Sequence, residues 1–150
     1  NFVKWAFEDG SPAQSFDASE ISFEFWEDRI GSENYKVTWK YNASTNNYLR
    51  ENGGEPHVDL ASGEQISAGN VVILFMRERT SVDRNKHLLY TTIGEGQALV
   101  FQNGKVIEGE WNKDSRESRT RIFDENGSEV SFVRGPIWIE VLPLGNEVNY

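Results

Sequence analysis

Cysteine is absent from this sequence of 150 residues, and histidine occurs only twice. Without thiols the chain has no disulfide, no thiolate zinc or iron–sulfur site and no cysteine nucleophile. Two imidazoles cannot build a histidine-rich metal cage, so a metal would need carboxylate ligands. No apolar run approaches the roughly 20 residues of a membrane-spanning helix. We therefore expect no metal, no other cofactor and no transmembrane helix.

Basic residues are also few, with 15 Lys and Arg against 24 Asp and Glu, which gives a net charge of −9. This field repels phosphate backbones, so nucleic acid is not an expected partner. The length suits one domain with a sizeable core and is too short for two. Because the chain opens at Asn1 without an initiator Met or a signal-like apolar run, we expect a mature form or an excised domain.

What the sequence does contain is a β-strand composition. Apolar and polar residues alternate in 21–25 and 35–41, and 71–76 is a continuous apolar run that indicates a central strand buried on both faces. No window shows a helical stripe. These patterns predict an all-β domain, mainly antiparallel, built as a sandwich or a partly open barrel with little helix. Further strands are expected at 87–93, 97–102, 105–111, 119–123, 129–133 and 137–142.

Turn residues support this prediction. Asn103-Gly104 lies between two apolar runs and predicts a type I′ hairpin, and Asn126-Gly127 predicts a second hairpin with a longer loop. The segment 56–59 stands between two glycine turns and is expected as a short extended piece at an edge. Gly94-Glu95-Gly96 lacks the third glycine of a dinucleotide fingerprint and predicts a turn between strands. The polar, aperiodic stretch 78–86 predicts a mobile loop.

Few residues point to chemistry. His57 and Asp59 are spaced to share one face of a strand, where they could reach one metal or substrate, although a structural hydrogen bond of His57 is the stronger interpretation. No Gly-x-Ser-x-Gly elbow occurs, and no carboxylate pair stands out for glycoside cleavage. The sequence therefore favours binding over catalysis.

Tryptophan and arginine supply the other candidates. Alternation predicts a core position for Trp39 and leaves Trp138 open, whereas Trp111 lies at a polar strand end and is the best candidate for an exposed functional ring, with core and surface equally open. Arg119 and Arg121, in a basic cluster with Lys113 and Arg116, could bind a carboxylate or phosphate. The alternative is a solvated face paired with Asp and Glu.

Several phrases stand together in an order that resembles the C-terminal domain of the YerB-like bacterial lipoproteins, over about residues 20 to 143. They are Tyr41-Asn42, Tyr48-Leu49-Arg50, Gly54-Glu55-Pro56-His57-Val58-Asp59, Ser62-Gly63-Glu64-Gln65-Ile66, Asn70-Val71-Val72, Gly94-Glu95-Gly96, Val100-Phe101-Gln102-Asn103-Gly104-Lys105-Val106-Ile107-Glu108-Gly109-Glu110-Trp111, Thr120-Arg121-Ile122-Phe123-Asp124 and Ile137-Trp138-Ile139-Glu140-Val141-Leu142-Pro143.

The resemblance implies an extracytoplasmic protein, lipid-anchored at an upstream cysteine, whose larger N-terminal domain lies outside this chain. Residues 1–150 would then be its single C-terminal β domain, with 1–19 and 144–150 loosely attached. The family is one of unknown function, so no catalytic residue carries over. Polar and aromatic residues within the matched phrases form the predicted ligand-binding set: Arg50, His57, Asp59, Trp111 and Arg121.

Two functions are open at this point. The first is a non-enzymatic binding or docking module of the cell envelope, whose partner is the missing N-terminal domain, an envelope protein or a peptidoglycan fragment. The second is an accessory domain that completes the active site of a cell-wall-modifying enzyme. In both, the membrane is reached only through the upstream lipid anchor. Convergence of Arg50, His57 and Asp59 in one pocket would support a ligand site.

Overall fold

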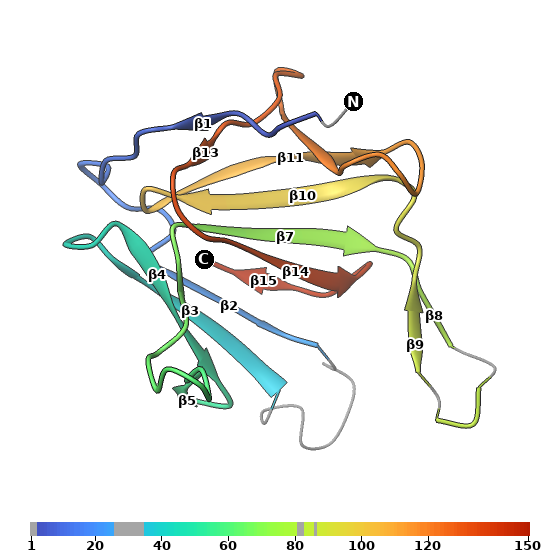
Figure 1. Cartoon of the computed structure of the whole chain (residues 1–150), viewed down its shortest axis with the longest axis horizontal. Helices are drawn as coiled ribbons and strands as arrows, with labels where there is room; N and C mark the ends of the chain where they lie inside the picture. The colour runs from blue at the N-terminus through green and yellow to red at the C-terminus, as the bar shows by residue number, and fades with distance from the viewer. Residues whose placement is uncertain (1–2, 26–34, 81–82, 86) are drawn as a thin grey trace.

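The computed structural model describes residues 3–25, 35–80, 83–85 and 87–150. These residues form β-strands and no α-helix, which confirms the predicted fold class. Within the same part of the chain, no helix is long and apolar enough to cross a membrane. Figure 1 shows two main sheets, with β1 and β13 along one side and the β8–β9 hairpin extending away from the sheets.

One main sheet has five strands in the order β12 (Arg121–Asp124), β11 (Lys105–Lys113), β10 (Gly94–Gln102), β7 (Asn70–Met76) and β14 (Ile137–Pro143). Every residue of β7 is buried, and the strand is flanked on both sides, as its continuous apolar run predicted. Neighbouring strands are antiparallel except β7 and β14, which run parallel. β14 therefore ends the sheet beside its most buried strand.

The second main sheet is antiparallel, with the order β15 (Val148–Asn149), β2 (Glu20–Glu24), β3 (Lys36–Asn42), β4 (Asn47–Asn52) and β5 (Glu55–Pro56). The short strand β6 (Ser67–Ala68) also pairs with β4. The sequence did not predict β4, because its inward positions are Tyr48 and Arg50, and a charged residue breaks the apolar alternation. The short extended piece expected at 56–59 lies at the edge of this sheet, as predicted.

Two apolar clusters form the core, one on each face of the five-stranded sheet. The first lies between the two main sheets and joins Trp39 and Tyr48 to Val71 and Ile73 of β7. The second includes Val72 and Leu74 of β7. It is covered by Trp5 and by apolar residues of the segment from β12 to β13 (Phe132–Val133). Beside it, β1 (Phe7–Glu8) pairs in parallel with β13. Alternate residues of β7 thus face different clusters.

Both predicted hairpins are present. Asn103 and Gly104 have φ values of 57° and 75°, the left-handed pair that a type I′ turn requires. The Gly104 carbonyl also accepts hydrogen bonds from the backbone N–H groups of Asp17 and Ala18, which fastens the N-terminal segment to this turn. In the second hairpin, Asp124 N–H donates to the Ser128 carbonyl at 2.9 Å.

Two predictions about loops were wrong. Gly94-Glu95-Gly96 is not a turn but the start of β10, where Gly96 lies opposite Trp111. A Cβ on Gly96 would lie 2.7 Å from Trp111 Nε1, so glycine here leaves room for the indole. In the predicted loop 78–86, β8 (Glu78–Thr80) pairs with β9 (Leu88–Tyr90), and positions 81–82 and 86 lie outside the described residues.

Candidate functional site

The candidate site lies where the two main sheets meet, and it is built on a buried arginine. Arg50 of β4 is paired across the strands with Trp39 of β3, and 6% of its side chain is exposed. A buried guanidinium needs a counter-charge, because desolvation of an unpaired ion costs several kcal/mol. The carboxylate of Glu140 supplies it, with Oε1 3.1 Å from Arg50 Nε. This ion pair connects the two sheets.

Glu140 belongs to β14 and has the same parity as Trp138, so both side chains turn to the inner face of the five-stranded sheet. Trp39 Nε1 also donates to Glu140 Oε1 at 3.3 Å. The Arg50 guanidinium carbon lies 5.8 Å from the Trp39 ring centroid and 5.3 Å from that of Trp138, within cation–π range. Two indoles and one carboxylate therefore surround the guanidinium.

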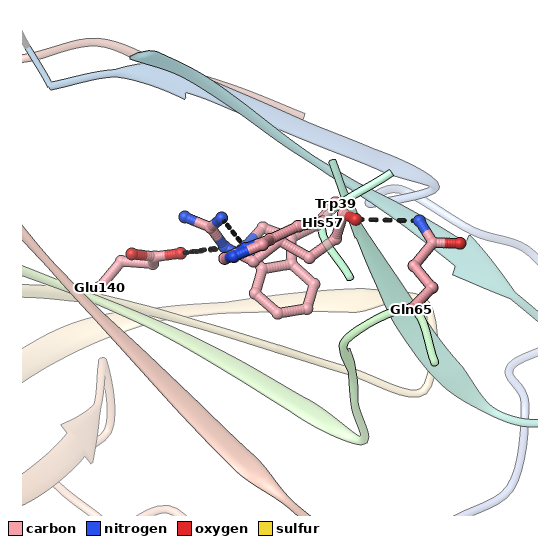
Figure 2. A network of polar contacts seen from close by, with 5 residues as sticks. Trp39, His57, Gln65 and Glu140 are labelled. Atoms are coloured by element: carbon pink, nitrogen blue, oxygen red, sulfur yellow. Dashed lines mark hydrogen bonds and ion pairs between the residues drawn. The ribbon is translucent and has the colours of Figure 1, made fainter. Parts of the chain in front are cut away.

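His57 completes the group, which we call the Arg50 cluster: Trp39, Arg50, His57, Trp138 and Glu140. Arg50 Nη1 and His57 Nδ1 are 2.6 Å apart. A dashed line at His57 marks this contact in Figure 2. A guanidinium only donates hydrogen bonds, so Nδ1 is the acceptor and the neutral ring carries its proton on Nε2. In the described part of the chain, no group hydrogen-bonds His57 Nε2. His57 and Trp138 are half-buried, and their ring centroids are 6.4 Å apart.

Backbone hydrogen bonds explain how His57 reaches Arg50. His57 N–H donates to the Arg50 carbonyl at 2.9 Å, and Arg50 N–H donates to the Ile66 carbonyl at 2.9 Å. Gln65 Nε2 also donates to the Arg50 carbonyl, at 2.9 Å (Figure 2). The chain from β5 to β6 thus folds back on β4, and this return brings the imidazole within hydrogen-bond distance of the guanidinium.

Asp59 supports this return but does not join the cluster. Its Oδ1 accepts hydrogen bonds from the backbone N–H groups of Ser62 at 2.8 Å and Ala61 at 3.1 Å. These hydrogen bonds lower the pKa of the Asp59 carboxyl, and the bond from Ser62 has the largest effect. β5 ends at Pro56, so His57 and Asp59 do not share one face of a strand as predicted. The Asp59 carboxylate is engaged in the turn instead. Among the described residues, no three His, Cys, Asp or Glu side chains could hold a metal together.

Trp111 is a core residue. The sequence left core and surface open, and the indole is 2% exposed, in the apolar cluster on the far face of the five-stranded sheet. Its Nε1 donates to the Phe75 carbonyl at 3.0 Å, which satisfies the polar end of the ring. Trp111 therefore cannot act as the exposed ring that its polar neighbours suggested.

Arg121 is exposed, on the strand at the opposite end of the five-stranded sheet from β14. Its guanidinium lies over the Phe123 ring at 4.6 Å, and its Nε is 3.4 Å from Glu129 Oε2. Arg119 Nη1 lies 2.5 Å from the other carboxylate oxygen. Both arginines lower the pKa of the Glu129 carboxyl, and Arg119 has the larger effect. Of the five residues predicted as a set, the structure thus brings together only Arg50 and His57.

Sequence reasoning missed Glu140 and Gln65 and left Trp138 undecided. One signal was available for Glu140, because it is the lone charge in the apolar strand at 137–142 and has the inward parity of Trp138 and Leu142. Such a residue must find a buried partner. Its partner lies 90 positions away in the sequence, so the pairing itself could not be read from local pattern.

The chain is similar to a known bacterial protein in sequence and in structure. "Putative lipoprotein YerB" of Bacillus subtilis is 26% identical over 108 residues, which are 71% of this chain and 31% of that protein. A crystal structure of the YerB protein from Bacillus subtilis matches with a TM-score of 0.74 at 20% identity, over 93% of this chain and 47% of that chain. The chain thus spans less than half of these relatives.

The likeness to the solved structure shows that the fold is shared. A family model, described as the C-terminal domain of a protein of unknown function (DUF3048), matches residues 28–139, the greater part of the sequence. The matched residues include four members of the Arg50 cluster, from Trp39 to Trp138. The curated relative confirms the resemblance to the YerB-like lipoproteins. The chain therefore belongs to the DUF3048 C-terminal domain family.

Proposed function

We propose that this chain is a non-enzymatic binding module of an extracytoplasmic lipoprotein, and that it binds its ligand at the half-buried side of the Arg50 cluster. The observation that carries the proposal is the 2.6 Å contact between Arg50 Nη1 and His57 Nδ1. It occupies the imidazole lone pair that a general base needs and leaves Nε2–H as a donor. His57 can then hold a ligand acceptor but is not arranged to remove a proton.

The chemistry of the ligand follows from the two half-buried rings. Trp138 is half-buried, and the exposed part of its ring can contact the apolar side of a sugar or a peptide group. The adjacent His57 Nε2–H can donate to a hydroxyl or carbonyl oxygen of the same ligand. A peptidoglycan fragment carries both kinds of group, as does a peptide segment of an envelope protein or of the N-terminal part of a longer relative. We choose the soluble peptidoglycan fragment as the first ligand to test.

Two substitutions of His57 separate binding from stability. In His57→Asn the amide oxygen can replace Nδ1 as acceptor for Arg50, while the outward donor is lost. We expect a urea midpoint close to that of the wild type and affinity lower by about fivefold, as for one lost hydrogen bond of about 1 kcal/mol. His57→Gln keeps an amide donor near the position of Nε2 and should bind more tightly than His57→Asn. Calorimetric titration with soluble peptidoglycan fragments measures both.

Arg121→Gln is the matched control, since it also removes a polar group of the predicted set but on the opposite end of the sheet. It should leave the affinity unchanged. Equal affinities of all three variants and the wild type would contradict the proposed site. Mass spectrometry of the fragment after incubation tests the other function. Cleavage only when the N-terminal part of a longer relative is added would favour the accessory role in an enzyme, and cleavage by this chain alone would contradict the non-enzymatic proposal.

A further inference from the structure

The five-stranded sheet leaves one long edge open, at β14. At the opposite end of the sheet, residues 128–130 cover β12, where Val130 N–H donates to the Ile122 carbonyl at 2.9 Å. The second main sheet ends in the two-residue strands β15 and β5. In the part of the chain that the structure describes, β14 is thus the long end strand without a covering segment. Folded proteins usually shield such an edge because it can pair with another chain.

The hydrogen-bond parity of β14 shows which backbone groups are open. Asn70 N–H donates to the Pro136 carbonyl at 3.2 Å, and Leu144 N–H donates to the Met76 carbonyl at 3.1 Å. In a parallel ladder, residues bond to one side alternately, so even-numbered residues of β14 bond to β7. Ile137, Ile139 and Val141 therefore turn their N–H and C=O groups away from the sheet. Among the described residues these groups have no hydrogen-bond partner.

We propose that this edge binds β14 of a second copy of the chain, antiparallel about a two-fold axis at Ile139. In this register Ile139 faces Ile139 of the partner subunit, and Ile137 faces Val141 of the partner subunit. All three outward residues of each copy then form hydrogen-bonded pairs, because such pairs recur at every second residue of an antiparallel ladder. The two five-stranded sheets would become one continuous sheet. The inference rests on the backbone of β14 and does not depend on the proposed function.

Side chains and charge also fit a second copy. The three facing pairs are all β-branched and apolar, a combination that stabilises cross-strand neighbours, and Ile139 is 42% exposed until it is covered. The lone charge of the strand, Glu140, would lie opposite Trp138 of the partner subunit and is already neutralised by Arg50 at 3.1 Å. No like charges face each other. Pro143 has no N–H, and the two-fold axis places a Pro143 at each end of the ladder, where it stops the pairing.

The contact is short, so we expect a weak dimer. A small interface supports only transient association, and a net charge of −9 on each copy opposes it at low salt. Sedimentation at about 0.3 M salt, where the Debye length is near 6 Å, and at up to about 1 mM protein should show a rise from 17.1 kDa toward twice that mass.

Charged substitutions test the two-fold register. Ile139→Lys and Ile139→Glu should each abolish the dimer, because like charges would face each other, and an equal mixture of the two should restore it. Leu60→Lys is the control, since Leu60 is fully exposed and off the edge. It should leave dimerisation unchanged. Near-ultraviolet circular dichroism checks that each variant is folded.

Cysteine cross-linking gives a second readout with a milder change. The natural chain has no cysteine, and Cα atoms of a hydrogen-bonded pair lie about 5.5 Å apart, within disulfide range. Ile139→Cys should therefore oxidise to a covalent dimer at least tenfold faster than Leu60→Cys. A wild type that stays monomeric at about 1 mM, equal cross-linking rates, or a mixture that does not associate would each overturn the proposal. Pairing of the β14 edge with a different protein, without self-association of this chain, would also overturn the proposal.

Discussion

At the scale of single residues, the most informative contrast is between two glycines with nearly equal φ angles. Gly104 has φ +75° and Gly127 has φ +76°. A Cβ on Gly104 would lie 2.4 Å from Phe16 Cδ1 and 2.8 Å from Tyr41 Cε1, whereas a Cβ on Gly127 would meet nothing within 4 Å. The two positions therefore share the cost of a left-handed residue and differ in the space around it.

Alanine at each position should separate these two costs. Gly127→Ala should lower the free energy of unfolding by about 1 kcal/mol, the cost of φ > 0 for a residue with a Cβ. Gly104→Ala should cost about 1 to 3 kcal/mol more, because the methyl group overlaps two aromatic rings. Urea denaturation measures both. Equal losses would show that Phe16 moves aside without cost.

Sequence predicted some of these residue roles and not others. Asn103-Gly104 was predicted as a turn because the left-handed conformation selects Asn and Gly directly. Gly96 was wrongly predicted in a turn. Glycine is needed there because a Cβ would collide with the Trp111 indole on the neighbouring strand, and local sequence does not contain that contact. A glycine required by backbone conformation can be predicted, whereas one required by a neighbour needs the fold.

At the scale of elements, Glu129 ties the β12 hairpin together. Its carboxylate pairs with Arg119 at 2.5 Å and Arg121 at 3.4 Å, and these charges lower its pKa below the ordinary value of 4.5. A carboxyl with a lowered pKa in the folded state adds stability above its unfolded pKa. That contribution is lost as the pH falls through the folded pKa.

Glu129→Gln should therefore destabilise the protein more at neutral pH than in acid. We expect a lower urea midpoint than wild type near pH 7 and a difference that shrinks on acidification to about pH 3. Glu125→Gln, an exposed carboxyl of the same hairpin, is the control and should show a smaller effect at both pH values. A constant difference between Glu129→Gln and wild type at the two pH values would mean that the ionised carboxylate is not what stabilises the hairpin.

Element prediction failed where a strand has an unusual inner face. The strand at 71–76 was predicted as central because its apolar run is continuous, and that prediction is confirmed. β4 was missed because Arg50 replaces the apolar residue expected at an inward position. Its partner Glu140 comes from β14, whose parallel pairing with β7 no local pattern indicates. The candidate site is built from just these two features, so sequence could name Arg50 and His57 but not assemble the cluster.

At the scale of the whole molecule, the two apolar clusters share their central strand. Val71 belongs to the cluster between the main sheets and Val72 to the cluster on the far face, and both side chains are fully buried. Loss of packing on one face removes support for β7 and hence for the other face. We therefore predict that the chain unfolds as one cooperative unit, although it spans less than half of the solved relative.

Paired core substitutions test this cooperativity. Val71→Ala and Val72→Ala should each lower the free energy of unfolding by about 2 kcal/mol. In urea, tryptophan fluorescence and far-ultraviolet circular dichroism should give one common midpoint for each variant, displaced by a similar amount. Refolding should take milliseconds to seconds, because the ladder depends on contacts between distant residues such as Arg50 and Glu140, 90 positions apart. Two separate transitions, with each substitution displacing only one, would instead show that the two faces of the sheet fold independently.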